Sequence, residues 1–302
     1  MRVVIAGAGA VGCHYGSRLQ QAGNSVRFLA RGTHLNALQQ HGLLHESEGS
    51  SVRLHVEAID HCADIADADV LILCCKMTAL MPMFESLSGK IGAETLLVTL
   101  QNGVEAVDWV TTKFPNHAIA AGTAFIGARL EAPGHVIHSA AGSIRLGLWQ
   151  SGAGDRLLPE LIAQFKAGGV PARREAEPAL MLWRKLLWNT GFNAITAIHR
   201  CFASQICEQP EMLAIARSAM GETVAVAQAE GIKLGEDDIQ GHIDVTLSMG
   251  PVKTSMWQDI EAGHATEVEY LNGLVVRQGE LHGIATPVNR MLVAQVHAIE
   301  VA

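Results

Sequence analysis

The sequence predicts two domains, an N-terminal α/β domain built on a parallel sheet and an all-α C-terminal domain. Three observations carry this prediction. Short β-branched runs alternate with helical patterns through the first half of the chain, which is typical of a parallel sheet covered by helices. Glycine and proline then punctuate the segment between residues 150 and 171. From about residue 176 onward the β-rich runs stop and a helical period takes over.

The same periodicities predict the individual elements. Strands are expected over residues 2–6, 25–30, 52–57, 69–75, 95–100, 118–125 and 143–148. Helices are expected over residues 10–22, 33–41, 78–88, 104–112, 155–167, 176–200, 211–230, 235–249, 266–282 and 287–300. A boundary near residue 170 gives domains of residues 1–170 and 171–302, each of a common domain size.

Composition restricts the partners. The 302 residues are 49% hydrophobic and 17% charged, which favours a well-buried globular enzyme over a disordered chain. A net charge of -8 gives no electrostatic reason to expect nucleic acid or an anionic membrane, and a small anionic substrate would need locally placed cations. No apolar run approaches the ~20 residues of a membrane span. Glycine interrupts the apolar start at once, which predicts a strand rather than an export signal.

The cysteines and histidines suggest neither disulfides nor a metal centre. The six cysteines, Cys62 among them, form no C-x-x-C motif, so reduced thiols in a cytoplasmic protein are expected. The chain contains 14 histidines but no H-E-x-x-H motif. Several of them share no spacing: His34, His41, His45, His55 and His61.

A glycine-rich turn follows the first predicted strand and leads into a helical pattern. It reads Gly7-Ala8-Gly9-Ala10-Val11-Gly12. In such a turn the first glycine permits the tight bend, the second lets the backbone approach a pyrophosphate, and the third lets helix and strand pack closely. The helix N-terminus then offers N–H groups to the phosphates. In this context the turn predicts a Rossmann-type domain that binds a dinucleotide.

The end of the second predicted strand indicates which dinucleotide. An NAD site usually carries an acid there, bonded to the ribose 2′-hydroxyl. Residues 1–45 contain no Asp or Glu, and Arg31 follows the strand instead. A guanidinium can pair with a 2′-phosphate, so this position favours NADP(H), although a solvated surface arginine is the simpler alternative.

Two further positions follow predicted strands of the same sheet. Lys76 follows the strand over 69–75, and Asn102 follows the strand over 95–100. The carboxyl ends of parallel strands line the ligand crevice, so Lys76 is expected to face it. Asn102 would bond a substrate or the nicotinamide ribose, but an ordinary turn-forming Asn-Gly pair explains it equally well.

The second half contains a polar stripe on an apolar helix. Lys185, Asn189 and Asn193 are spaced i, i+4 and i+8, so they project from one face. Buried amides and amines need partners, which either a structural hydrogen-bond network or a ligand would supply. A half-buried lysine loses its charge more easily than one in water, which suits an acid that protonates a developing alkoxide.

A second polar cluster lies between residues 253 and 273. Ser255 has a hydroxyl that would donate to a carboxylate. Glu267 is expected to open a helix, where the dipole favours a carboxylate. Spacing alone leaves open whether Glu267 has a functional role or is an ordinary first-turn residue.

Together these motifs resemble the ketopantoate reductase family over nearly the whole chain. The N-terminal half contributes G-A-G-A-V-G, Ala30-Arg31-Gly32, Cys75-Lys76, Gln101-Asn102-Gly103 and Gly127-Ala128-Arg129. The C-terminal half contributes Trp183-Arg184-Lys185-Leu186, Thr254-Ser255-Met256, Gln258-Asp259-Ile260 and the run Thr266 to Gly273.

The resemblance implies NADPH-dependent reduction of 2-dehydropantoate to (R)-pantoate, in the route to pantothenate and coenzyme A. It makes Lys185 the proton donor and gives Glu267 a supporting role at the catalytic centre and beside the cofactor. Substrate would be held by Asn102, Asn189, Asn193 and Ser255. Cofactor would be held by Gly7, Ala8, Gly9, Ala10, Val11, Gly12, Arg31, Lys76, Asn102 and Ala128.

One position departs from the family pattern. Members commonly carry an Asn-Gly pair after the Lys185 helix, whereas this chain reads Ala203-Ser204. Two alternatives therefore stay open beside the leading hypothesis: a sister reductase for another small 2-keto acid, and a sensor that binds NADP without turnover. The apolar helices of the second half leave a homodimer open.

Overall fold

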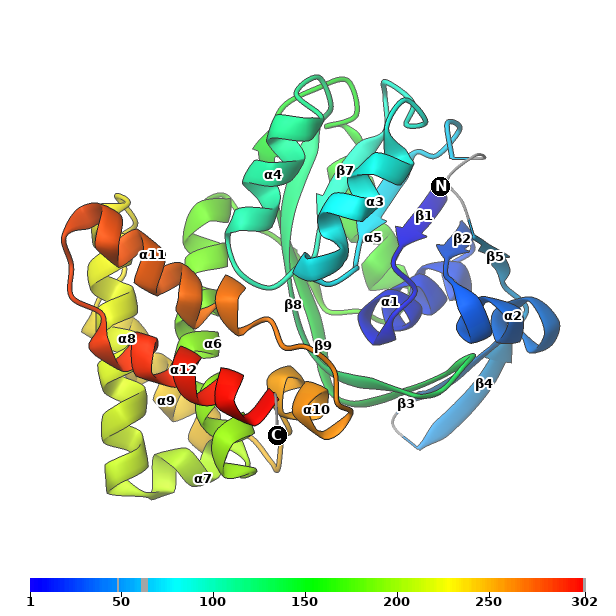
Figure 1. Ribbon diagram of the computed structural model, residues 1–302. Helices are drawn as coiled ribbons and strands as arrows, with labels where there is room; N and C mark the ends of the chain where they lie inside the picture. Colours follow the sequence, from blue (N-terminus) through cyan, green and yellow to red (C-terminus); the bar gives the residue numbers. More distant parts are fainter. Residues whose placement is uncertain (48, 61–64, 301–302) are drawn as a thin grey trace. The chain divides into compact units, whose positions relative to one another are not determined.

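The computed structural model describes residues 1–47, 49–60 and 65–300 (Figure 1). The chain divides into two compact units. The first comprises Met1–Gln101 and Glu105–Pro178, and the second comprises Asn102–Val104 and Ala179–Ala302. The predicted fold class, a Rossmann-type α/β domain followed by an all-α domain, is confirmed. Cys62 and His61 lie outside the described residues.

The first unit is built on one ten-stranded sheet. The strand order is β4-β3-β9-β8-β7-β6-β1-β2-β5, and β10 pairs with β9. The strands are β1 (Arg2–Ala6), β2 (Ser25–Leu29), β3 (Leu43–Ser47), β4 (Ser50–Leu54), β5 (Glu57–Ile59), β6 (Val70–Leu73), β7 (Leu96–Thr99), β8 (Ile119–Ala132), β9 (His135–Gln150) and β10 (Ala172–Arg174).

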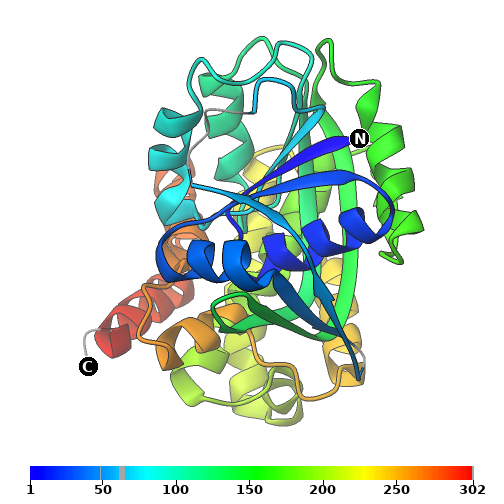
Figure 2. The same ribbon diagram turned by 90° about the vertical axis from the view of Figure 1, so that its right-hand side faces the viewer.

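The centre of the sheet follows from its sequence. Strands β6 and β7 are buried along their whole length, and β1 is buried after its first residue. These strands pair in parallel and are continuous apolar runs, as expected for strands covered on both faces. Their predicted positions are confirmed. Helix α1 (Ala10–Gln21) covers one face of these strands, and α3 (Leu80–Leu87) and α4 (Glu105–Lys113) cover the opposite face (Figure 2).

The periphery of the sheet differs from the sequence prediction. Strands β8 and β9 form one long antiparallel hairpin, so the sheet is mixed rather than wholly parallel. Only the ends of this hairpin were predicted, as strands over 118–125 and 143–148. Strands β3 and β10 were not predicted, and the strand predicted over 52–57 falls on the end of β4 and the start of β5. Strands of three to five residues carry too few residues for a clear alternating pattern.

The helices of the first unit agree closely with the prediction. They are α1 (Ala10–Gln21), α2 (Gly32–His41), α3 (Leu80–Leu87), α4 (Glu105–Lys113) and α5 (Leu157–Ala167), with a 3₁₀ turn η2 (Met77–Ala79). Helix α5 packs on α1, and the two helices share the apolar core of the sheet.

The second unit is helical throughout its described residues. Its elements are α6 (Pro178–His199), α7 (Ala203–Glu208), α8 (Pro210–Ala229), α9 (Glu236–Ser248), α10 (Ser255–Glu261), the 3₁₀ turn η3 (Val268–Tyr270), α11 (Asn272–His282) and α12 (Pro287–Glu300). Helix α6 is buried almost continuously from Met181 to Ala197, which makes it the centre of this unit. No helix in the described part of the chain is long and apolar enough to cross a membrane.

The helix predicted over 266–282 was wrong in its first part. The chain forms η3 there, and Leu271 then adopts φ -114° and ψ -93°, which no α-helix accommodates. The α-helix begins only at Asn272. Helices α7 and α10 were missed because six or seven residues are too short to display a helical period.

Candidate active site

The glycines of the predicted phosphate-binding turn have three different environments. Gly7 has φ +109°, and a Cβ there would lie 2.5 Å from Cys75 N. A Cβ at Gly12 would lie 2.3 Å from Gly7 O. At Gly9 a Cβ would meet no described protein atom within 4 Å. Gly7 and Gly12 are therefore required by the fold, whereas Gly9 leaves the space that a closely approaching phosphate needs.

This turn opens onto the N-terminus of α1. The helix begins at Ala10, its first turn contains no acid, and no side chain of the described residues caps it. The N–H groups of Ala10, Val11 and Gly12 have no carbonyl partner within the helix. Before them, Ala8 N donates to Leu29 O at 3.0 Å, which fixes the turn to β2. The free donors and the helix dipole together favour an anion here.

Two exposed cations follow the strands on either side of β1. Arg31 follows β2 and is the N-cap of α2, and Lys76 follows β6. Strands β6, β1 and β2 are parallel neighbours, so Lys76, the glycine turn and Arg31 all follow the carboxyl ends of adjacent strands. Ala128 lies in the part of β8 that continues past the end of β7. Arg31 thus stands at the end of β2, as expected from the sequence.

Helix α6 carries the predicted proton donor. Lys185 is half-buried, whereas its neighbours Leu186 and Leu187 are fully buried. Burial lowers the pKa of Lys185 to about 8, against the attraction of the Glu267 carboxylate, which raises it. A pKa near 8 leaves Lys185 protonated at neutral pH and makes it a stronger acid than an ordinary lysine.

Two asparagines continue the Lys185 face of α6. Asn189 is 4% exposed and Asn193 is 2% exposed. Asn193 Nδ2 donates to Asn189 Oδ1 at 3.3 Å. Within the described part of the chain, the remaining two atoms, Asn189 Nδ2 and Asn193 Oδ1, are buried without a hydrogen-bond partner. Each such atom costs about 1–3 kcal/mol, so the helix presents one donor and one acceptor that a ligand would satisfy.

Glu267 lies beside this face although it is distant in sequence. It is 8% exposed and stands at the N-cap of η3, so the expectation that it opens an α-helix was wrong. Asn102 Nδ2 donates to Glu267 Oε2 at 3.1 Å. Asn102 is thus more than a turn residue, because its side chain orients the carboxylate that acts on Lys185.

The start of α10 is tied to α6. Ser255, the predicted substrate ligand, is the exposed first residue of α10. Before it, Thr254 Oγ1 lies 2.6 Å from Thr196 Oγ1 on α6, and both threonines are buried. Thr196 follows Asn193 by less than one turn of α6, so this bond places Ser255 near the asparagine end of the stripe. In the sequence, Thr254 was named only within a family motif, and Thr196 was not named. A threonine directly before a helix is a common N-cap, which is the one local signal for Thr254.

Ala203 and Ser204 lie at the start of α7. Ala203 is fully buried in the apolar core of the second unit, and Ser204 is half-buried. The only polar side chain of this pair is therefore the hydroxyl of Ser204.

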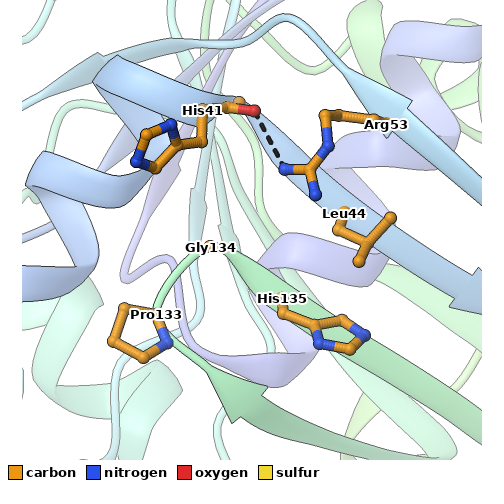
Figure 3. Close-up of a pocket in the computed structure, with 7 residues that line it drawn as sticks. His41, Leu44, Arg53, Pro133, Gly134 and His135 are labelled. Carbon is orange, nitrogen blue, oxygen red and sulfur yellow. Dashed lines mark hydrogen bonds between the residues drawn. The ribbon is translucent and has the colours of Figure 1, made fainter.

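The first unit also contains a pocket that the sequence did not predict. A pocket of about 400 Å³ lies between the end of α2 and the turn joining β8 to β9 (Figure 3). Arg53 Nη1 donates to His41 O at its rim, at 3.0 Å, and His135 completes its polar lining. None of its lining residues was predicted to bind substrate or cofactor. Among the described residues, no group of three or more His, Cys, Asp or Glu is arranged to hold a metal ion.

Comparison with known proteins gives one consistent result. Residues 3–151 match the family model described as ketopantoate reductase PanE/ApbA, and residues 179–300 match the model of its C-terminal part. A 2-dehydropantoate 2-reductase from Halobacterium salinarum is 31% identical over 294 residues, which cover 97% of this chain and 96% of that protein.

Solved structures agree. A PanE/ApbA family ketopantoate reductase from Ralstonia eutropha is 33% identical with a TM-score of 0.89, covering 99% of this chain and 98% of that one. A D-mandelate dehydrogenase, solved with NADH and anilino(oxo)acetate, is 28% identical with a TM-score of 0.91 over the same shares. Relatives of this fold thus act on more than one acid.

Proposed function

Because the chain belongs to the ketopantoate reductase family, we propose that it reduces 2-dehydropantoate to (R)-pantoate with NADPH. One observation supports this most directly. A half-buried lysine of lowered pKa lies on the same helix face as two buried amides, and one atom of each amide has no partner in the described part of the chain. A face built only for stability would pair those atoms.

The chain's own contribution to the reaction is acid catalysis. When bound, NADPH supplies the hydride that adds to the keto carbon. Lys185 gives its proton to the keto oxygen as negative charge develops there, so the C=O bond becomes C–OH and Lys185 regains a proton from water. An ammonium aimed at that oxygen stabilises the transition state more than the ground state. Glu267 favours the protonated form of Lys185 that the step requires.

The residues of the first unit fit NADPH. The space at Gly9 and the uncapped N-terminus of α1 would receive the pyrophosphate, held by the turn from Gly7 to Gly12. Arg31 would pair with the 2′-phosphate. Further cofactor contacts are proposed for Lys76 and Ala128 of the first unit, and for Asn102 and Glu267 of the second unit.

The assignment of Arg31 can be tested by itself. Arg31→Ala should raise the Kd for NADPH by about 10- to 100-fold, because a charge-assisted bidentate hydrogen bond contributes about 1.5–3 kcal/mol. The Kd for NADH should change by less than about two-fold, since NADH has no 2′-phosphate. Fluorescence titration of both nucleotides measures the difference. Equal losses for both would refute the 2′-phosphate assignment.

The substrate is proposed to bind through the second unit. Asn189 Nδ2 offers a donor to an acceptor oxygen of the acid, and Asn193 Oδ1 accepts from a hydroxyl. Ser255 and Asn102 would add further hydrogen bonds. This donor and acceptor pair suits a 2-keto acid that carries a hydroxyl group, as 2-dehydropantoate does.

A second candidate is a reductase for another small 2-keto acid. Ala203, which stands where the family pattern has a substrate-binding Asn, is buried and has no polar group. The D-mandelate dehydrogenase similar to this chain was solved with a different acid. Loss of one polar contact would favour a substrate with fewer hydroxyl groups.

Steady-state assays separate the candidates. NADPH consumption should be measured with 2-dehydropantoate and with a panel of aliphatic and aromatic 2-keto acids. The highest kcat/KM for 2-dehydropantoate supports the proposal, and a higher value for another acid supports the second candidate.

Lys185→Ala should lower kcat by about 10²- to 10⁴-fold while the Kd for NADPH is retained. NADPH binding without reduction of any acid would instead indicate a sensor. Fractionation and light scattering would test the cytoplasmic location and the homodimer.

A further inference from the structure

The turn that carries Glu267 is held from the C-terminal helix. Thr266 N, one residue before Glu267, donates to Glu300 Oε1 of α12 at 2.7 Å. Thr266 Oγ1 in turn accepts from Val268 N at 3.3 Å, one residue after Glu267. The backbone on both sides of Glu267 is therefore fixed through Thr266, and Thr266 is fixed by Glu300.

His297 adds two further contacts to this arrangement. We call the hydrogen-bonded group of Thr266, Glu269, His297 and Glu300 the clamp. His297 Nδ1 lies 2.9 Å from Glu300 Oε2, and His297 Nε2 lies 2.7 Å from Glu269 Oε1. Ionised carboxylates only accept hydrogen bonds, so both ring nitrogens donate and the imidazole is positively charged. Glu269 lies on η3, two residues after Glu267. His297 thus joins two carboxylates that hold opposite sides of the turn.

The charges around His297 support its protonation. Hydrogen bonds to Glu269 and then Glu300 raise the pKa of His297, and burial opposes them only weakly. From α11, Arg277 Nη1 donates to Glu269 Oε2 at 3.3 Å and to Glu269 O at 2.9 Å. Burial alone would raise the pKa of Glu300, but the hydrogen bonds from Thr266 and His297 outweigh it and lower that pKa.

We propose that Glu300 and His297 are positioning residues, which hold Glu267 beside Lys185 through the turn over residues 266–270. This inference rests on the proposed function, in which Lys185 is the acid. Neither residue needs to touch substrate or cofactor. Their effect reaches the reaction because the Glu267 carboxylate raises the pKa of Lys185 against the effect of burial. A turn released from α12 would let Glu267 move away, and Lys185 would lose its proton at a lower pH.

The clamp has a defined pH range. A group whose pKa is raised on folding stabilises the fold below its unfolded value, and the effect is lost as pH rises through the raised value. For His297 the unfolded value is about 6.5. The clamp is therefore complete below about pH 6.5 and is released as pH rises through the raised pKa of His297.

The test compares two glutamates that each bond one histidine. Glu300→Gln removes the negative charge of Glu300 from the clamp. Glu230→Gln is the matched control, because Glu230 Oε1 bonds His282 Nε2 at 2.6 Å in the same unit, at the end of α8. Glu300→Gln should lower kcat by about three- to ten-fold and move the alkaline limb of kcat/KM down by about half a pH unit. Glu230→Gln should leave the limb unchanged. His297→Gln is a second variant that should shift the limb in the same direction as Glu300→Gln.

A measurement without turnover keeps this inference separate from the proposed function. The protein labelled with [ε-¹³C]lysine gives the pKa of Lys185 directly by NMR, with the resonance assigned through Lys185→Arg. The pKa of Lys185 should fall in Glu300→Gln and stay unchanged in Glu230→Gln. A parent protein that reduces no acid would overturn the proposed function only. An unchanged Lys185 pKa in both Glu300→Gln and His297→Gln would overturn the clamp.

Discussion

Two buried polar clusters, one in each unit, differ in how their hydrogen bonds are satisfied. In the first unit, His14 Nδ1 lies 3.1 Å from His45 Nε2, and Ser47 Oγ lies 2.8 Å from His138 Nδ1. In the second unit, Asn189 and Asn193 bond each other and leave one buried atom each without a partner in the described part of the chain. A satisfied cluster stabilises a fold, whereas an unsatisfied one costs stability and is available to a ligand.

The histidine cluster is closed by groups that determine its proton positions. Arg18 Nη2 donates to Ser47 Oγ at 2.9 Å, which leaves the Ser47 hydroxyl to donate to His138 Nδ1. His138 Nε2 lies 3.1 Å from the carbonyl oxygens of Ala140 and Ala141, so this nitrogen carries a proton. The cluster connects α1, β3 and β9, and we expect its contacts to stabilise the fold.

The largest expected effect is on the asparagine pair. The double variant Asn189→Leu with Asn193→Leu should lower kcat/KM by about 10²- to 10³-fold, because substrate loses both hydrogen bonds. The free energy of unfolding should stay equal or rise by about 1 kcal/mol, since replacing both partners by apolar groups removes the unsatisfied atoms. Steady-state kinetics and urea unfolding measure the two quantities. A loss of stability as large as that expected for the histidine cluster would remove the distinction between the clusters.

Two glycines of the same turn are expected to have different roles. Gly7 should matter for the stability of the fold, and Gly9 should matter for NADPH binding. Gly7→Ala should lower the free energy of unfolding by about 2–4 kcal/mol, because alanine disfavours φ +109° and its Cβ would overlap the backbone of Cys75. Gly9→Ala is the matched control, with no described atom within 4 Å of the added Cβ. It should change stability by less than about 0.5 kcal/mol and weaken NADPH binding by about ten-fold or more. Normal NADPH affinity in Gly9→Ala would contradict the pyrophosphate assignment.

Breaking the histidine cluster should have the opposite outcome to breaking the asparagine pair. His138→Leu leaves the Ser47 hydroxyl and two carbonyl oxygens with one partner fewer. The free energy of unfolding should fall by about 2–3 kcal/mol. At 25 °C, where the variant is still folded, kcat/KM should stay within about two-fold of the parent. A ten-fold loss of kcat/KM in fully folded protein would show that this cluster also serves catalysis.

How much the sequence predicted depends on the distance between partners along the chain. The glycine turn is six consecutive residues, and Lys185, Asn189 and Asn193 share one helix face, so local patterns predicted both. The bond from Asn102 to Glu267 spans 165 residues, and no local pattern contains it. The family resemblance named both residues, but it could not supply their contact.

The histidine cluster of the first unit could not be predicted from local sequence either. His14, His45 and His138 have no shared spacing in sequence, yet the sheet brings β3 beside β9 and α1 against both. Long-range strand pairing determines this cluster, and short strands such as β3 give a weak signal. Likewise, the break at Leu271 depends on tertiary contacts of Asn272, whose Nδ2 donates to Thr190 O at 3.0 Å. A helical period cannot predict a break that distant residues impose.

The last expected effect is the acid sensitivity of the histidine cluster. Burial first, and then repulsion from Arg18 and the other histidines of the cluster, lowers the pKa of His14 to about 2 and that of His45 to about 4. The unfolded value is about 6.5, so the unfolded chain takes up protons first as pH falls. Stability should therefore decrease below about pH 6.5, by up to roughly 1.4 kcal/mol per pH unit for each histidine, until pH reaches the folded values.

Urea unfolding at intervals from pH 7.5 to pH 5 measures this slope. His45→Asn should be less stable than the parent at pH 7.5 but lose less stability between pH 6.5 and pH 5, because one group with a lowered pKa has been removed. His282→Asn is the control, since His282 bonds Glu230 at the surface and lies outside the cluster. Its slope should match that of the parent. Parallel slopes for His45→Asn and the parent would show that proton uptake by the histidine cluster does not cause the acid sensitivity.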